Sequence, residues 1–155
     1  MKFFCLGDSL TFGYGVSSAD RWTYIASKES SFELVNMGIC GDTSGGILIR
    51  VRELLNKLSA STTERRYIFA MGGCNDILYS GTSAGAKENM GAVIHNLLSS
   101  GEIPIIGIPM PISDGNYPNQ WINTADYNYA SGLISEYGNW LYEFCNSFGV
   151  FSIDF

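Results

Sequence analysis

The chain has 155 residues, of which 46% are hydrophobic and 15% charged, and this balance predicts one globular domain with a substantial apolar core. Nine Lys and Arg stand against fifteen Asp and Glu, and the net charge of −6 argues against nucleic acid or an anionic membrane as a partner. No apolar stretch approaches the roughly 20 residues of a membrane span, and the N-terminal apolar run is too short for a secretory signal. We therefore expect a soluble, cytoplasmic protein.

Apolar runs rich in β-forming residues alternate along the chain with segments of helical periodicity. Five strands are predicted, at 2–6, 33–37, 67–71, 104–108 and 149–153. Helices are predicted between them, at about 19–29, 44–58, 84–99 and 124–148. Because this alternation is typical of βαβ units, we expect an α/β fold with a five-stranded parallel sheet covered on both faces.

Two connections carry more specific expectations. Asp42, Thr43 and Ser44 can each bond the free backbone N–H groups at the start of the helix at about 44–58. The loop 110–123 is polar and aromatic, and we expect it at the rim of a pocket, where Trp121 could line a subsite for an acyl group or a sugar.

Three short segments follow the first three predicted strands. They are Gly-Asp-Ser-Leu at 7–10, Gly-Ile-Cys-Gly-Asp-Thr-Ser at 38–44 and Gly-Cys-Asn-Asp at 73–76. Ligands bind at the carboxyl edge of open parallel sheets, so these segments are expected to meet there. A serine hydroxyl attacks a carbonyl when a base takes its proton and hydrogen-bond donors stabilise the oxyanion. Ser9 is the candidate nucleophile, and the N–H groups of Ser9 and Gly41 and the Asn75 amide are candidate donors.

These segments resemble the GDSL, or SGNH, family of serine esterases and lipases, in family order and over essentially the whole chain. The resemblance implies a flavodoxin-like three-layer α/β/α sandwich, no cofactor, and small-molecule ester substrates with short acyl, lipid, aryl or acetylated-sugar groups. It makes Ser9 the nucleophile of a GDSL-type serine ester hydrolase, with Gly41 and Asn75 in the oxyanion hole.

The family's last block, Asp-x-x-His after the fifth strand, does not occur in this sequence, which ends at Phe155. We expect a C-terminally incomplete single domain, with the Asp, the His and a final helix in a missing tail; as written, the chain lacks the base that activity needs. The absent helix would leave part of one sheet face uncovered, and an uncovered apolar face favours a homodimer.

Other titratable residues near these segments favour structural roles. The single histidine, His95, lies in a predicted helix, and Asp154 has no histidine to orient, so neither is expected to act in catalysis. Asp8 is expected to bond local backbone and Asp76 to cap the turn after the third strand.

The four cysteines are widely spaced and are expected to be reduced thiols. Cys5, Cys40 and Cys74 lie near the three segments, where we expect them to fill space in the core. No Cys-x-x-Cys pair or histidine cluster is present, so no metal site is predicted.

Two other classes of protein remain open. One is a catalytically inactive protein of the same fold that binds an acyl or sugar ligand. The other is a flavodoxin-like cofactor binder, which the sequence disfavours because Asp8 would face a phosphate with like charge.

Overall fold

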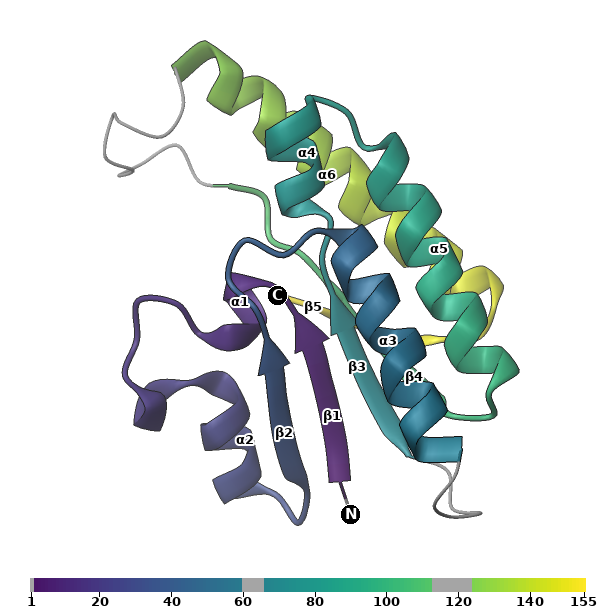
Figure 1. Ribbon diagram of the computed structural model, residues 1–155. Helices are drawn as coiled ribbons and strands as arrows, with labels where there is room; N and C mark the ends of the chain where they lie inside the picture. Colours follow the sequence, from purple (N-terminus) through teal and green to yellow (C-terminus); the bar gives the residue numbers. More distant parts are fainter. Residues whose placement is uncertain (1, 60–65, 113–123) are drawn as a thin grey trace.

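The computed structural model describes residues 2–59, 66–112 and 124–155 (Figure 1). The elements in chain order are β1 (Lys2–Gly7), α1 (Ser9–Phe12), the 3-10 helix η1 (Ser18–Asp20), α2 (Trp22–Glu29), β2 (Glu33–Gly38), α3 (Ser44–Ser59), β3 (Tyr67–Met71), α4 (Cys74–Ser80), α5 (Ala84–Ser99), β4 (Ile103–Ile108), α6 (Thr124–Ser147) and β5 (Phe151–Asp154). All five predicted strands are confirmed, with bounds that differ by at most two residues.

The helices differ from the prediction at three places. The helix predicted at about 19–29 begins at Trp22, after the 3-10 turn η1. The short helices α1 and α4 were not predicted, because each spans too few residues to show a periodic apolar pattern. Both begin inside the motifs that follow β1 and β3, so they place the candidate site residues.

The five strands form one parallel sheet in the order β2-β1-β3-β4-β5. This is the flavodoxin-like order, in which the connections leave β1 and β3 toward opposite sides and open a crevice at the carboxyl edge. Gly7 of β1 pairs with Gly38 and with Met71, so β1, β2 and β3 end level with one another. The three loops that follow them therefore start from one place.

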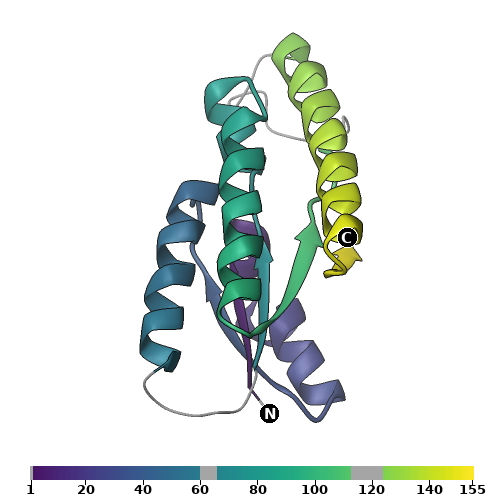
Figure 2. The same cartoon turned by 90° about the vertical axis from the view of Figure 1, so that its right-hand side faces the viewer.

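One face of the sheet is covered by α3, α5 and α6, as the view in Figure 2 shows. The core on this side includes Leu6, Ile68 and Ile106 from the strands, all fully buried. Alternation along the strands sends these residues to one face and their neighbours to the other. The expected three-layer α/β arrangement is confirmed.

The opposite face is covered less completely. Trp22 of α2 packs edge-on against Phe69, and a small cluster of buried side chains lies beneath it. Toward β5 the same face is open, since Phe151 is 69% exposed and Ile153 46%. The expected partly uncovered face is present. Among the helices of the described segments, none is long and apolar enough to cross a membrane.

Candidate active site

Ser9 is the first residue of α1 and follows β1 almost directly. The Asp8 side chain caps this helix by accepting a hydrogen bond from the Leu10 N–H at 2.9 Å. The first N–H groups of a helix have no partner within it, so the Ser9 N–H is available to a ligand. The cap thus fixes a half-buried Ser9 at the carboxyl edge of the sheet.

Asp8 lies beneath the site and is 2% exposed. Burial raises the pKa of its carboxyl above the ordinary value, the bond from Leu10 N–H partly offsets this, and the charges of Asp42 and Asp76 raise it further. Its bond to local backbone confirms the expected structural role.

Gly41 lies in the loop between β2 and α3, which passes between α1 and α4 in Figure 1. Its φ of +78° is a conformation that strains residues with side chains. The nearest atom to a Cβ placed there would be the hydroxyl of Tyr79, at 3.7 Å. Gly41 is exposed, so a substrate oxygen can approach its backbone. Tyr79 was not singled out in the sequence.

Asn75 is in the first turn of α4, and its Nδ2 donates to the Asp42 carbonyl oxygen at 2.7 Å. This bond brings the Asn75 side chain to the loop that contains Gly41. An amide nitrogen carries two hydrogens, so one remains for a ligand. The structure therefore places two of the three predicted oxyanion donors beside each other.

Asp76 binds the start of α3. The prediction that it caps the turn after β3 was therefore wrong. Its Oδ2 accepts from the Ser44 N–H at 2.8 Å and its Oδ1 from the Ser44 hydroxyl at 2.6 Å. Asn89 of α5 also donates to the Ser44 hydroxyl, at 3.0 Å. The cap comes from 32 residues away, and local sequence carries no signal for such a contact.

Asp42 is also used differently from the prediction. Thr43 accepts a bond from the Gly46 N–H at 3.3 Å, as expected of a cap, whereas Asp42 forms an ion pair with Arg50. The sequence did hold a signal for this pair. Arg50 lies three residues after the buried Ile47 and four before the buried Leu54, so it is a charged residue on the apolar stripe of α3.

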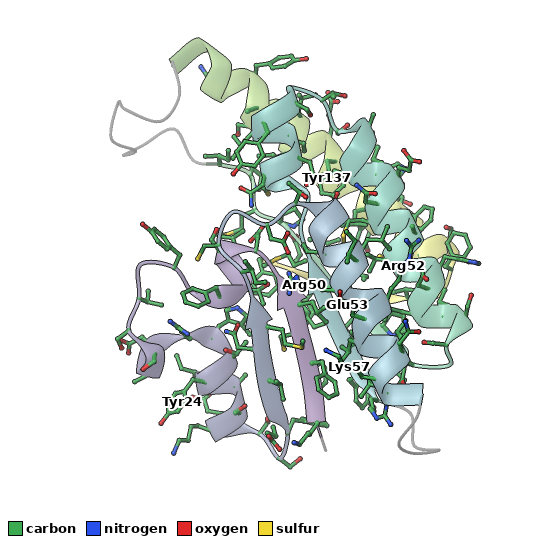
Figure 3. The ribbon with its side chains drawn as sticks, viewed as in Figure 1. Tyr24, Arg50, Arg52, Glu53, Lys57 and Tyr137 are labelled. Atoms are coloured by element: carbon green, nitrogen blue, oxygen red, sulfur yellow. The ribbon has the colours of Figure 1, made fainter. Side chains whose placement is uncertain are left out.

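Arg50 makes several bonds at the edge of the sheet. Its Nε donates to Asp42 at 2.9 Å, Nη2 donates to the same carboxylate and to the Gly7 carbonyl oxygen at 2.9 Å, and Nη1 donates to the Met37 carbonyl oxygen. Figure 3 shows Arg50 directed from α3 toward the ends of β1 and β2.

A buried tyrosine supports the loop that precedes Asn75. The hydroxyl of Tyr137 in α6 donates to the Gly72 carbonyl oxygen at 2.8 Å, and Tyr137 lies near α4 in Figure 3. Its side chain is fully buried, and burial raises the pKa of the phenol well above 10.0. The phenol is therefore a neutral donor, and the sequence analysis missed it.

The cysteines near the site divide into two kinds. Burial raises the pKa of the Cys5 thiol to about 12 and that of Cys74 also to about 12, so both remain protonated and serve as packing. Cys40 is exposed, and the prediction that it fills core space was wrong. It lies in the turn before Gly41, where the backbone leaves the sheet.

His95 and Asp154 are not brought to Ser9. His95 is exposed in the second half of α5 and lines an apolar groove with Phe144 and Phe148 of α6. Because α5 leads to the start of β4, this part of the helix lies toward the amino edge of the parallel sheet. Neither the His95 nor the Asp154 side chain forms a hydrogen bond to a described residue of the Ser9 site.

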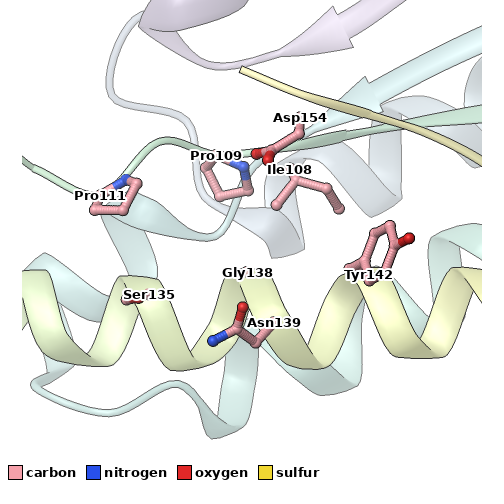
Figure 4. A pocket seen from close by; sticks show the side chains of 8 residues that line it. All are labelled: Ile108, Pro109, Pro111, Ser135, Gly138, Asn139, Tyr142 and Asp154. Atoms are coloured by element: carbon pink, nitrogen blue, oxygen red, sulfur yellow. The ribbon is translucent and has the colours of Figure 1, made fainter.

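Asp154 lines a cavity of about 290 Å³ between α6 and the chain that follows β4 (Figure 4). Pro109, Asn139 and Tyr142 line it too. Trp121 and most of the loop 110–123 lie outside the described residues, so their predicted place at a pocket rim stays a prediction. The described part of the chain holds no group of three or more His, Cys, Asp and Glu suited to a metal ion.

Comparison with known proteins identifies the family of this chain. The model of the GDSL-like Lipase/Acylhydrolase family matches residues 5–155. Esterase TesA of Pseudomonas aeruginosa is 27% identical in an alignment of 137 residues that covers 84% of this chain and 64% of that protein. The chain thus spans less than two thirds of the length of this curated relative.

Several solved structures share the fold. A lipolytic protein of the G-D-S-L family from Veillonella parvula has a TM-score of 0.82 at 24% identity, over 99% of this chain and 77% of that one. An aryl esterase from M. smegmatis has a TM-score of 0.78 at 17% identity, over 99% and 83%. Est24, a carbohydrate acetylesterase from Sinorhizobium meliloti, has a TM-score of 0.77 at 16% identity, with the same coverage.

Proposed function

The chain belongs to the GDSL-like lipase/acylhydrolase family, and on that premise we propose that it is a serine ester hydrolase with Ser9 as its nucleophile. The observation that carries the proposal is the 2.7 Å hydrogen bond from Asn75 to the Asp42 carbonyl. It joins the loops after β2 and β3 at the edge where Ser9 follows β1. Three potential donors to an oxyanion thus come from three loops at one edge.

In the proposed reaction, the Ser9 Oγ bonds to the carbonyl carbon of the ester, and the carbonyl π electrons move to its oxygen. The Ser9 N–H, the Gly41 N–H and the second Asn75 hydrogen donate to this oxyanion. As the tetrahedral intermediate collapses, the bond to the alcohol oxygen breaks and an acyl-serine forms. Water then attacks the acyl group and releases the acid and Ser9.

A base has to take the Ser9 proton and deliver it to the departing alcohol. The single histidine of the sequence is on α5, toward the other edge of the sheet. The proposal therefore assigns the base to a histidine outside these 155 residues, in the Asp-x-x-His block that the family resemblance implies.

The proposed substrates are small carboxylic esters with short acyl, lipid, aryl or acetylated-sugar groups, and no cofactor takes part. An aryl esterase and a carbohydrate acetylesterase share the fold, which supports this range. Leu10, Ile39 and Tyr79 are exposed apolar or aromatic residues in or near the three loops, where they suit an apolar substrate group.

The test is hydrolysis of p-nitrophenyl acetate by this chain, with imidazole added as an external base and Ser9→Ala as the matched control. We expect Ser9-dependent hydrolysis that rises with imidazole, and a Ser9 acetyl adduct detected by mass spectrometry in the wild type alone. Equal rates in both proteins and no adduct would contradict the proposal.

A second candidate function is ligand binding without catalysis, favoured by the position of His95 on α5. It predicts that an acyl or sugar ligand raises the melting temperature while Ser9→Ala leaves the rate of ester hydrolysis unchanged.

A further inference from the structure

We propose that Arg50 is a positioning residue for the oxyanion hole, because it ties the Asp42 carboxylate to the ends of β1 and β2 and so fixes the turn that presents Gly41. The inference rests on the function proposed above. It concerns a residue of α3 that is not expected to touch the substrate.

The first step is the anchor. One guanidinium binds the Gly7 carbonyl at the end of β1, the Met37 carbonyl near the end of β2, and the Asp42 carboxylate. The Arg50 and Asp42 side chains are 17% and 14% exposed, so water screens their attraction only weakly. The Gly7 carbonyl also accepts from the Ile39 N–H at 3.0 Å, at the start of the same loop.

The second step is transmission through a turn. The Asp42 N–H donates to the Ile39 carbonyl at 3.1 Å, which closes a four-residue turn with Gly41 in its third position. A positive φ at this position sets the orientation of the peptide between Cys40 and Gly41, and that peptide carries the Gly41 N–H. If this peptide flipped, the N–H would turn away from its present direction. Fixing the position of Asp42 therefore fixes the direction of the Gly41 N–H.

The third step joins the second donor to the same residue. The Asp42 carbonyl accepts the bond from Asn75, so a shift of Asp42 moves both the turn and the Asn75 amide. Arg50 also balances the charge of Asp42. An unpaired carboxylate this close to the donors would oppose the negative charge that develops on the substrate oxygen.

Packing against α3 provides an independent way to disturb this anchor. A Cβ at Gly46 would lie 1.9 Å from Asp42 Oδ1, so alanine cannot be accepted unless the carboxylate moves. At Gly45, one residue earlier in the same helical turn, a Cβ would meet Asn89 Nδ2 at 3.5 Å, an ordinary contact. Gly45→Ala and Gly46→Ala raise helix propensity equally, and only the second displaces Asp42.

The experiment measures kcat and KM for Ser9-dependent hydrolysis of p-nitrophenyl acetate with imidazole. Oxyanion donors act in the transition state, so Gly46→Ala and Arg50→Met should lower kcat by about tenfold or more and change KM by less than about twofold. Gly45→Ala and Arg52→Met, which changes an exposed arginine of the same helix, should stay within about twofold of wild type in both. Arg50→Lys keeps the charge but not the planar set of donors, and should be intermediate.

Nuclear magnetic resonance separates this inference from the proposed function. In Arg50→Met and Gly46→Ala, the Gly41 backbone amide and the Asn75 side-chain amide should shift and exchange faster, while Gly45→Ala leaves them unchanged. If the wild type shows no Ser9-dependent turnover, the proposed function fails, and these signals alone decide whether Arg50 holds the loop. Unchanged signals, or an unchanged kcat in an active protein, would overturn the inference.

Discussion

The two halves of the carboxyl edge are built in different ways. At the ends of β1, β2 and β3, side chains of α3 and α4 bind the loops: Arg50 holds Asp42, Asn75 holds its carbonyl, and Asp76 holds Ser44. At the end of β5, Asp154 is exposed and makes no side-chain hydrogen bond with the described residues. The proposed oxyanion donors are thus organised without the groups that would transfer the proton. This separation allows each half of the edge to be altered by itself.

The largest expected effect is on catalysis and comes from the half of the edge at the ends of β1, β2 and β3. Asn75→Ala removes a proposed oxyanion donor and the bond to Asp42, and should lower kcat for Ser9-dependent ester hydrolysis by roughly 10² to 10³. Asp154→Asn, at the other half of the edge, should change kcat by less than about twofold under the same imidazole-supported conditions. Equal losses in the two variants would show that the halves do not act separately.

The next largest effect is on the free energy of unfolding, and two tyrosines of α6 allow a comparison. Tyr137→Phe takes the donor from the buried Gly72 carbonyl and should lower the free energy of unfolding by about 1–3 kcal/mol. Tyr142 is 49% exposed and lines the cavity beside Asp154. Tyr142→Phe should therefore change the free energy of unfolding by less than about 0.5 kcal/mol. Urea denaturation measures both, and a Tyr142→Phe loss as large as that of Tyr137→Phe would contradict the comparison.

The smallest effect is on the pH dependence of stability. The pKa of Asp8 is raised in the folded protein, so above the ordinary value of 3.8 the folded state holds more protons than the unfolded state. The stabilisation from this group is complete below 3.8 and is lost as the pH rises through the folded pKa. Asp8→Asn keeps a cap for α1 and removes this dependence.

The Asp8→Asn variant should therefore gain stability relative to wild type as the pH rises from about 4 to 7. Urea unfolding at the two pH values measures the change, and Asp154→Asn controls for the loss of one negative charge. A difference between Asp8→Asn and wild type that stays constant with pH would contradict the assignment.

The sequence was informative where structure is repetitive. Nearly unbroken apolar runs of five residues predicted all five strands, and the order of the motifs placed Ser9, Gly41 and Asn75 after the first three. Their catalytic roles remain proposals, whereas their positions after β1, β2 and β3 are observed.

The contacts that support the site were harder to predict, since they join distant segments. Asp76 caps a helix that begins 32 residues earlier, and Tyr137 binds a carbonyl 65 residues away. The Arg50 contact was not predicted either, although a charge on an apolar helical stripe is a local signal that a buried partner is needed. Cys40 was misjudged because average burial of cysteine does not describe a residue in a turn that leaves the sheet.

The bond between Tyr137 and Gly72 also has a consequence for the order of folding. Ser9, Gly41 and Asn75 are all synthesised before α6, and β1, β2 and β3 can pair without it. The loop before Asn75 gains its buried donor only when α6 packs onto the sheet. We expect refolding to restore far-ultraviolet circular dichroism before it restores ester hydrolysis, and Tyr137→Phe to lengthen that delay. Packing of α6 would then complete a site whose proposed nucleophile and oxyanion donors, Ser9, Gly41 and Asn75, all precede it in the chain.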